Sequence, residues 1–363
     1  MKVAHNAAAD PARYQWVDAA KGACMILVVL FHAAGRFQYD LGTTVTGAWV
    51  LVSSVFSPIR MPLFFFVSGF LAASALGRPL SLARGRTWGF VYLYALWTLL
   101  FLPRVIPDAV HGDMQQPWGA LLSFVLPTTF WYLYALPLYF VLAWALMKAL
   151  RQRSVYALIP LFLLSATAFL LQPASNAILT DPWDPAKIPD VLRNFVWFYL
   201  AVHSKPLWIS ILRTSSPEKA VAATAAYAGL YWAAAANGLT DHLRAPLSIG
   251  ALYMCALLLG LWGGQGRIGV AIQKVGRQTL PVYVLHIFLM PVIMAAISAT
   301  GLSAVMKSSP DVWNAIAPPL VTLIVVYLTY QGGRLVLASH LAWLFSIPRW
   351  ITGAPTRATL AAR

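Results

Sequence analysis

Residues 16–33, WVDAAKGACMILVVLFHA, decide the fold, because an apolar run of this length is typical of a helix that crosses a lipid bilayer. The run contains a lysine, Lys21, and near its end a histidine, His32. Eleven positions separate them, so in a helix both side chains lie on one face, about 16 Å apart along the axis. Ionisable side chains are costly inside a membrane and by default face the interior of a helix bundle. The pair predicts a functional site, or else a snorkelling lysine and a histidine that ends the helix.

The composition of the whole chain is that of a polytopic membrane protein. Of its 363 residues, 60% are hydrophobic and 10% are charged, and the mean hydropathy is +0.69. Soluble chains carry about 25% charged residues. A soluble core of this size could not bury so much apolar surface, which excludes a soluble enzyme and a disordered chain. The net charge of +15 lies in short clusters between apolar runs, as in loops on one side of a membrane, so no nucleic-acid partner is predicted.

Further apolar runs predict an all-α bundle of about ten transmembrane helices with the lipid bilayer as partner. With the N-terminus in the cytoplasm, most of the 26 lysines and arginines fall on the cytoplasmic side, whereas Asp181 and Asp184 fall on the other. This asymmetry predicts an N-in, C-in protein with a cytoplasmic tail (1–16), a membrane domain (17–338) and a second cytoplasmic tail (339–363). The predicted spans are 17–36, 48–76, 88–106, 129–149, 155–172, 193–212, 220–237, 247–264, 279–300 and 317–338.

Arg60 lies between Pro58 and Pro62, inside the second predicted span or at a break in it. Prolines leave backbone carbonyls without partners, which is tolerated only where they line protein or a cavity. Arg60 is therefore predicted to hold an anion, to stabilise an oxyanion or to form a salt bridge. The alternative is an interfacial arginine on a short re-entrant stretch. Farther along the same span, Ser68 and Gly69 predict a close contact with another helix.

His286 lies well inside a later span, three residues after Tyr283, so the two side chains share a helix face. His286 is predicted either as a member of the site or as a histidine that a neighbouring helix satisfies. For His203, in the sixth predicted span, we favour the second interpretation. Cys24 and Cys255 both lie in apolar runs and predict neither a disulfide nor a metal site.

Two further groups of side chains are candidates for binding. Trp131, Tyr132 and Tyr134 begin the fourth predicted span, where aromatic belts occur, but sugars also stack on aromatic faces. They are therefore candidates for binding a carbohydrate acceptor. Arg84 and Arg86 follow the second span and are either charges that set the topology or a pair that binds phosphate groups. The sequence contains no Walker loop, Rossmann fingerprint, HExxH or GxSxG motif.

Four segments resemble, in the same order, blocks of the integral-membrane acyltransferase 3 family, which includes O-acetyltransferases of cell-envelope sugars. Residues 16–33 resemble its first-helix block, in which a basic residue precedes a histidine by eleven positions. Its second-helix, fourth-helix and late blocks resemble RMPLFFFVSGFL (60–71), FWYLYALPLYFVL (130–142) and VGRQTLPVYVLHIFLMP (275–291), the last with Thr279 in place of serine. The resemblance covers most of the chain.

The resemblance implies that an acyl group is taken from acyl-CoA on the cytoplasmic side of a bacterial-type inner (plasma) membrane. The group is delivered to an envelope glycan or lipid-linked sugar at or beyond the outer face. His32 stands for the catalytic histidine of the family, and Lys21 for its basic residue. The family's arginine pair is spaced Arg-x-x-Arg, and Arg84 with Arg86 departs from that spacing. Acetyl-CoA is the default donor, and no metal is implied.

These observations lead to a hypothesis of O-acyl transfer. The CoA phosphates bind among Arg84, Arg86 and Lys21, the pantetheine arm threads along the first helix, and the thioester reaches His32. His32 acts as a general base on the acceptor hydroxyl or carries the acyl group covalently.

The remaining catalytic candidates surround that histidine. Arg60 or Tyr283 would stabilise the oxyanion, and His286 would belong to the same site. Two alternatives involve no chemistry: a carrier or flippase of a lipid-linked saccharide, with the same aromatic and cationic lining, and a non-enzymatic subunit of an envelope-synthesis complex.

Overall fold

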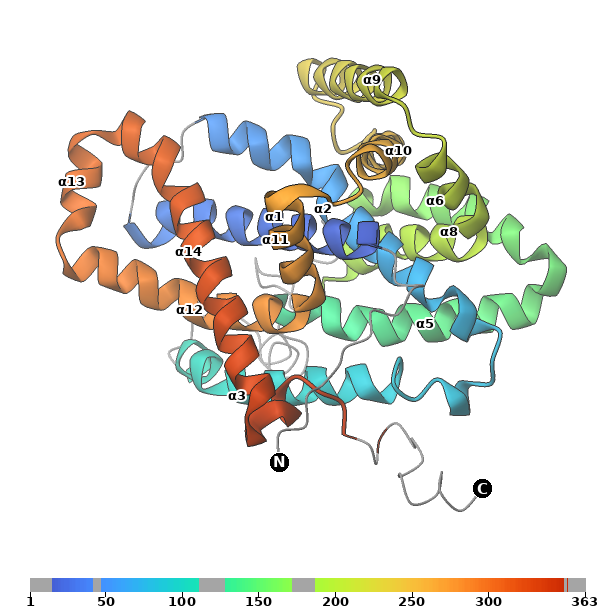
Figure 1. Cartoon of the computed structure of the whole chain (residues 1–363), viewed down its shortest axis with the longest axis horizontal. Coiled ribbons are helices and arrows are strands. Elements are labelled where there is room, and N and C mark those ends of the chain that lie inside the picture. Colours follow the sequence, from blue (N-terminus) through green and yellow to red (C-terminus); the bar gives the residue numbers. More distant parts are fainter. Residues whose placement is uncertain (1–14, 42–46, 111–127, 172–186, 349–350, 352–363) are drawn as a thin grey trace.

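The computed structural model describes residues 15–41, 47–110, 128–171, 187–348 and 351, which form helices and loops without a strand. The α-helices are α1 (Gln15–Leu41), α2 (Gly47–Leu76), α3 (Trp88–Val110), α5 (Trp131–Leu150), α6 (Leu158–Thr167), α8 (Ile188–Arg213), α9 (Pro217–Ala236), α10 (Arg244–Trp262), α11 (Gly266–Arg277), α12 (Thr279–Ala299), α13 (Leu302–Ser308) and α14 (Pro310–Ala338). Short 3₁₀ helices are η1 (Leu80–Leu82), η2 (Thr128–Phe130), η3 (Arg151–Ala157), η4 (Ala168–Leu171) and η5 (His340–Leu344). Figure 1 shows α1 and α11 near the centre of the molecule, with α9 and α3 at opposite edges.

Seven helical stretches of the described chain are long and apolar enough to span a membrane. One of them, Trp131–Leu171, contains both α5 and α6, and a non-helical backbone conformation at Arg151 (φ 50°) interrupts it. α3 has a shorter apolar stretch, Trp88–Pro103. The all-helical membrane fold is confirmed, whereas the count of about ten spans and the N-in, C-in orientation stay predictions.

Part of the predicted organisation lies outside the described residues. This applies to residues 1–14 of the N-terminal tail, to Asp181 and Asp184, and to most of the C-terminal tail after residue 348. The described beginning of that tail forms η5, which packs on the end of α14.

The second span is one helix. α2 continues through Pro58 and Pro62, so the interpretation of Arg60 as part of a re-entrant stretch is wrong. The prediction of a close helix contact at Ser68-Gly69 is confirmed for Gly69. A Cβ atom there would clash with the Phe198 carbonyl of α8, which brings the backbones of α2 and α8 together.

α1 is central because it packs on α2, α11, α12 and α14. α11 lies between two predicted spans, where apolar runs alone predict no helix. Its backbone approaches α1 at two glycines: a Cβ on Gly22 would clash with the Ile272 carbonyl, and one on Gly276 would clash with the Asp18 carbonyl. This contact holds the first turns of α1, which carry Asp18 and Lys21, against α11.

Gly22→Ala should destabilise the protein by about 1–3 kcal/mol, because the added methyl group meets backbone atoms that cannot turn away. Gly35→Ala is the matched control on the same helix, since nothing lies within 4 Å of its Cβ position. There the better helix propensity of alanine should leave stability unchanged or raise it by about 0.5–1 kcal/mol. Thermal unfolding in detergent tests both variants, and equal midpoints would contradict the close α1–α11 contact.

Candidate active site

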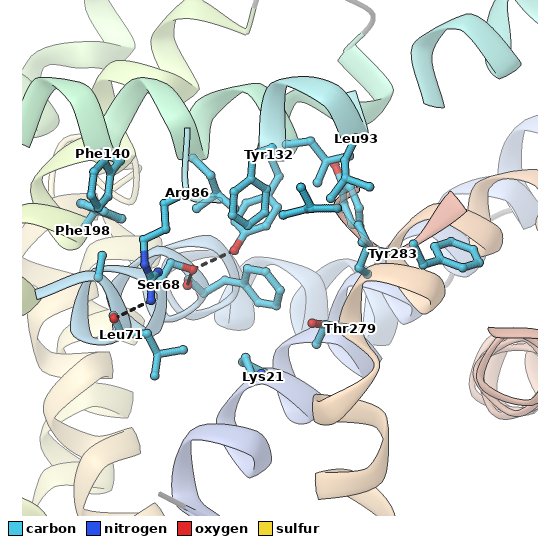
Figure 2. Close-up of a pocket in the computed structure, with 18 residues that line it drawn as sticks. Lys21, Ser68, Leu71, Arg86, Leu93, Tyr132, Phe140, Phe198, Thr279 and Tyr283 are labelled. Atoms are coloured by element: carbon cyan, nitrogen blue, oxygen red, sulfur yellow. Dashed lines mark hydrogen bonds between the residues drawn. The ribbon is translucent and has the colours of Figure 1, made fainter. Parts of the chain in front are cut away.

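A cavity of about 380 Å³ lies between α1, α2, α3, α5, α8 and α12. Its walls are mostly aromatic and aliphatic, with few polar groups, which is the usual form of a small-molecule site. Figure 2 shows the polar side chains that line it: Lys21, Ser68, Arg86, Tyr132, Thr279 and Tyr283. Four of these six residues, Lys21, Arg86, Tyr132 and Tyr283, are predicted site residues, and the fold brings these four to one cavity from four separate segments.

Lys21 is held by a buried carboxylate. Its Nζ atom lies 3.4 Å from Oδ1 of Asp18, and Nε of Arg277 lies 3.3 Å from Oδ2 of the same group. The Asp18 side chain is only 3% exposed, and a buried carboxylate is costly unless it is paired. The ion pairs with Lys21 and Arg277 compensate its charge. Sequence analysis missed Asp18 and Arg277, although Asp18 lies three residues before Lys21 on the same helix face.

Arg86 lines the same cavity from the loop after α2. Its Nη2 atom donates a hydrogen bond of 2.8 Å to the Leu71 carbonyl, which aims the guanidinium across the end of α2 (Figure 2). Burial lowers the pKa of Arg86 from its ordinary value, but an arginine starts so high that it stays charged at neutral pH. Arg84, predicted as its partner, is exposed and does not line the cavity. The structure therefore separates the predicted arginine pair.

Two tyrosines, Tyr132 and Tyr283, line the same cavity, and we call them the tyrosine wall. The rings of Tyr132 and Tyr283 contact edge to face, with centroids 5.7 Å apart. The Tyr132 hydroxyl is 2.8 Å from Oγ of Ser68, and the Tyr283 hydroxyl donates to the Thr129 carbonyl at 3.2 Å. These bonds fix both rings, so the wall is an ordered part of the site.

A pair of histidines lies outside the cavity, and one of them is next to Tyr283. The ring centroids of His32 and His286 are 5.3 Å apart, and His286 lies 6.1 Å from the Tyr283 ring. His286 is 1% exposed, whereas the His32 side chain is exposed. Nδ1 of His286 lies 3.0 Å from the Val282 carbonyl, which can only accept, so this nitrogen carries the proton. Nε2 of His286 is then an acceptor, and it is buried without a hydrogen-bond partner in the described part of the protein.

The cavity stops short of these histidines, since neither lines it. The passage from Lys21 to His32 that our hypothesis requires is therefore not open. Tyr283, which lines the cavity, lies with its ring centroid 6.1 Å from that of His286. Tyr283, which lines the same cavity as Lys21, is nevertheless linked to His32 through the ring of His286.

Comparison with known proteins decides the family. A family model described as an acyltransferase domain, that of acyltransferase 3, matches residues 14–331. The chain belongs to the acyltransferase 3 family. A relative, the "Inner membrane protein YcfT" of Escherichia coli (strain K12), is 27% identical over 211 residues, which cover 51% of this chain. The chain spans about half of that relative's length, 54%. No solved structure matches the chain.

Membership confirms the predicted family and supports acyltransferase activity in general. The seven candidate spans and the inner-membrane relative support the predicted place as a multi-pass protein of the bacterial inner membrane. Among the described residues, no group of three or more His, Cys, Asp or Glu side chains could hold a metal ion.

Three predicted candidates lie away from the cavity of this family member. Trp131 packs on Phe65 at 5.5 Å, and Tyr134 packs on Tyr94 at 5.5 Å, so of the three aromatic candidates only Tyr132 lines the cavity. Arg60 lies on the other side of His32, with its guanidinium 4.3 Å from the Phe31 ring centroid.

His203 contacts the Tyr199 ring at 4.6 Å and lies on α8, away from the pair of histidines. Its Nε2 atom is buried without a hydrogen-bond partner in the described part of the chain. The ring packs, and the predicted interpretation of His203 as a structural histidine stays a prediction.

Proposed function

We propose that the protein is an acyl-CoA-dependent O-acyltransferase of the bacterial inner membrane. It moves an acyl group, acetyl by default, to a hydroxyl of an envelope glycan or lipid-linked sugar. One observation carries this proposal: Lys21, Arg86 and the tyrosine wall line one cavity, and Tyr283 of that wall is next to His286, which in turn is next to His32.

The cavity suits the donor. Lys21 and Arg86 supply positive charge for the CoA phosphates, and a guanidinium matches the geometry of a phosphate group. The apolar wall suits the pantetheine arm. Arg84 no longer belongs to this part of the proposal, because its side chain is exposed outside the cavity. The proposal places the end with Lys21 at the cytoplasm, where acyl-CoA is found, in agreement with the predicted N-in orientation.

The tyrosine wall controls access of the bound thioester to His32 in this proposal. A thioester in the cavity reaches His32 only if the Tyr283 side chain turns, which breaks its hydrogen bond to Thr129. The freed hydroxyl can then donate to the oxyanion that forms on the thioester carbonyl. Tyr283 thus has two roles in the proposal, as a gate and as an oxyanion donor.

His32 is the proposed general base. Its imidazole takes the proton from the acceptor hydroxyl as the oxygen attacks the thioester carbonyl, forming the new C–O bond. The C–S bond breaks, and the proton passes to the departing thiolate, which leaves as CoA thiol. His286 supports this role because its ring is next to His32 and its Nε2 atom is an acceptor without a partner among the described residues, so it can orient a protonated His32 ring. Since His32 is exposed, an acceptor can approach it.

A carrier of lipid-linked saccharides is the second candidate, because an aromatic and cationic lining would serve a carrier equally well. Labelled acetyl-CoA, incubated with the purified protein in nanodiscs and an envelope glycan extract, distinguishes the two. We expect label in an ester that mild base releases, and none with heat-inactivated protein. A protein that moves a lipid-linked saccharide across vesicles and labels nothing would be a carrier.

A further inference from the structure

Two arginines are bound side by side to one face of α2. Nη1 of Arg60 donates to Oγ of Ser53 at 3.3 Å, and Nη2 of Arg244, from α10, donates to Oγ of Ser57 at 2.7 Å. The two serines are one helical turn apart, about 6 Å along the axis, and share a face with Arg60. The guanidinium groups are therefore neighbours, although they come from residues distant in the sequence.

The carboxylates near this pair compensate little of its charge. Arg244 lies 3.6 Å from Asp241, whose side chain is 66% exposed, and an exposed ion pair of this kind is weak. Asp190 and Arg193 both act on Arg244, and because Asp190 also pairs with Lys187 and Arg193, it compensates little of the charge on Arg244. Among the described residues, Arg60 has no carboxylate within ion-pair distance.

What Arg60 contacts is an aromatic ring and a neutral hydroxyl. Its guanidinium lies over Phe31, which offers only modest stabilisation to a cation. Like charges that are close together repel strongly inside a membrane protein, where the dielectric constant is low. Two neighbouring arginines whose charges are little compensated favour the binding of an anion.

The arginine pair lies close to the proposed base. One ring separates the Arg60 guanidinium from His32, since Phe31 lies 4.3 Å from the guanidinium and the Phe31 and His32 centroids are 5.4 Å apart. Arg60 also lines a narrow crevice between α1 and α2, together with Phe31 and Trp49. The crevice has a free volume of only about 10 Å³, so the sugar ring of an acceptor would lie over its mouth while its acid group approaches Arg60.

We propose that Arg60 and Arg244 form the anion subsite of the acceptor, so that the acceptor is a sugar carrying a phosphate or carboxylate group. The oxyanion binds the two guanidiniums and displaces the Ser53 contact, while a hydroxyl of the same sugar faces His32. The role of the subsite in binding an acceptor rests on the proposed acyl transfer, whereas the binding of an acidic sugar can be tested without it. The donor cations Lys21 and Arg86 line the other cavity and are not part of the subsite.

Binding of three probes to the purified protein tests the subsite without an acyl donor. We expect the protein, in nanodiscs of a neutral lipid, to bind a hexose 1-phosphate or a hexuronate at least about tenfold more tightly than the uncharged hexose. The difference should shrink as the salt concentration rises. Equal affinity for all three sugars would overturn the proposal, and so would loss of sugar-phosphate binding in nanodiscs of anionic lipid, because the site would then belong to lipid headgroups.

Variants assign the binding to the two arginines. Arg60→Gln and Arg244→Gln should each weaken binding of the sugar phosphate about 10- to 100-fold, with little effect on the uncharged sugar. Arg60→Lys keeps the charge in case the glutamine variant does not fold. Arg36→Gln is the matched control, because Arg36 is paired with Asp40 at 3.2 Å. Unchanged binding in Arg60→Gln and Arg244→Gln would contradict the assignment.

Measurements of acyl transfer test the proposed function separately from the subsite. Selective binding of acidic sugars by a protein that transfers no acyl group would support the subsite and overturn the proposed function. Equal transfer to acidic and neutral sugars, with equal binding of both, would overturn the subsite and leave the proposed function in place.

Discussion

His32→Ala should lower the rate of acyl transfer about 10²–10⁴-fold, the usual loss when a general base is removed. The effect should fall on the chemical step, so the apparent affinity for acyl-CoA should change little. The rate and the affinity for acyl-CoA should change independently, because His32 is exposed and lies outside the cavity proposed for the donor. Initial rates of label transfer from acetyl-CoA, measured over a range of donor concentrations, give both quantities.

His203→Ala is the matched control for this variant. His203 is also a histidine within a long apolar helix, and its Nε2 atom is likewise buried without a hydrogen-bond partner among the described residues, but it contacts Tyr199 on α8 rather than the pair of histidines. It should retain nearly the full rate. Wild-type transfer by a folded His32→Ala protein would remove His32 as the base, and comparable losses in both variants would indicate a structural effect.

The helices could be predicted well because their cause is local. A run of about 20 apolar residues must satisfy its backbone inside the bilayer, and a helix does so within one segment. α11 could not be found in this way, since residues 266–277 are amphipathic and fold against α1 through Gly22 and Gly276. The position of α11 depends on the close approach of its backbone to α1, which lies far away in the sequence.

In the candidate site, too, relations within one helix could be predicted and contacts between helices could not. Lys21 and His32 lie on one helix, so their spacing alone predicts a shared face, and Tyr283 and His286 are related in the same way. Whether two such faces meet depends on packing, and the contact between His32 and His286 could not be predicted from either segment.

Two features of the sites could not be predicted from the sequence, because they depend on loop conformation and on contacts between helices. Arg84 and Arg86 look alike in the sequence, and only the turn after α2 decides which of them lines the cavity. Arg244 gave no signal, because its relation to Arg60 exists only through the serines on α2.

Arg86→Ala should raise the KM for acyl-CoA about 10- to 100-fold and lower kcat much less, because it removes a charged contact to the CoA phosphates and leaves the histidines in place. Arg84→Ala removes an arginine two positions away that is exposed outside the cavity, so its KM should stay close to that of the wild type. Steady-state rates with acetyl-CoA at low salt compare the two variants, and equal KM values for both would contradict the role of Arg86.

A second donor separates phosphate binding from a structural effect of the same substitution. Arg86 also donates a hydrogen bond to the Leu71 carbonyl, so its loss could disturb the end of α2 and damage the cavity for any donor. Acetyl-pantetheine carries the thioester without the CoA phosphates. If Arg86 binds phosphate, Arg86→Ala should use this truncated donor as well as the wild type does. An equal loss with both donors would show that Arg86 acts only through the fold, and the cations of the cavity would then need another ligand.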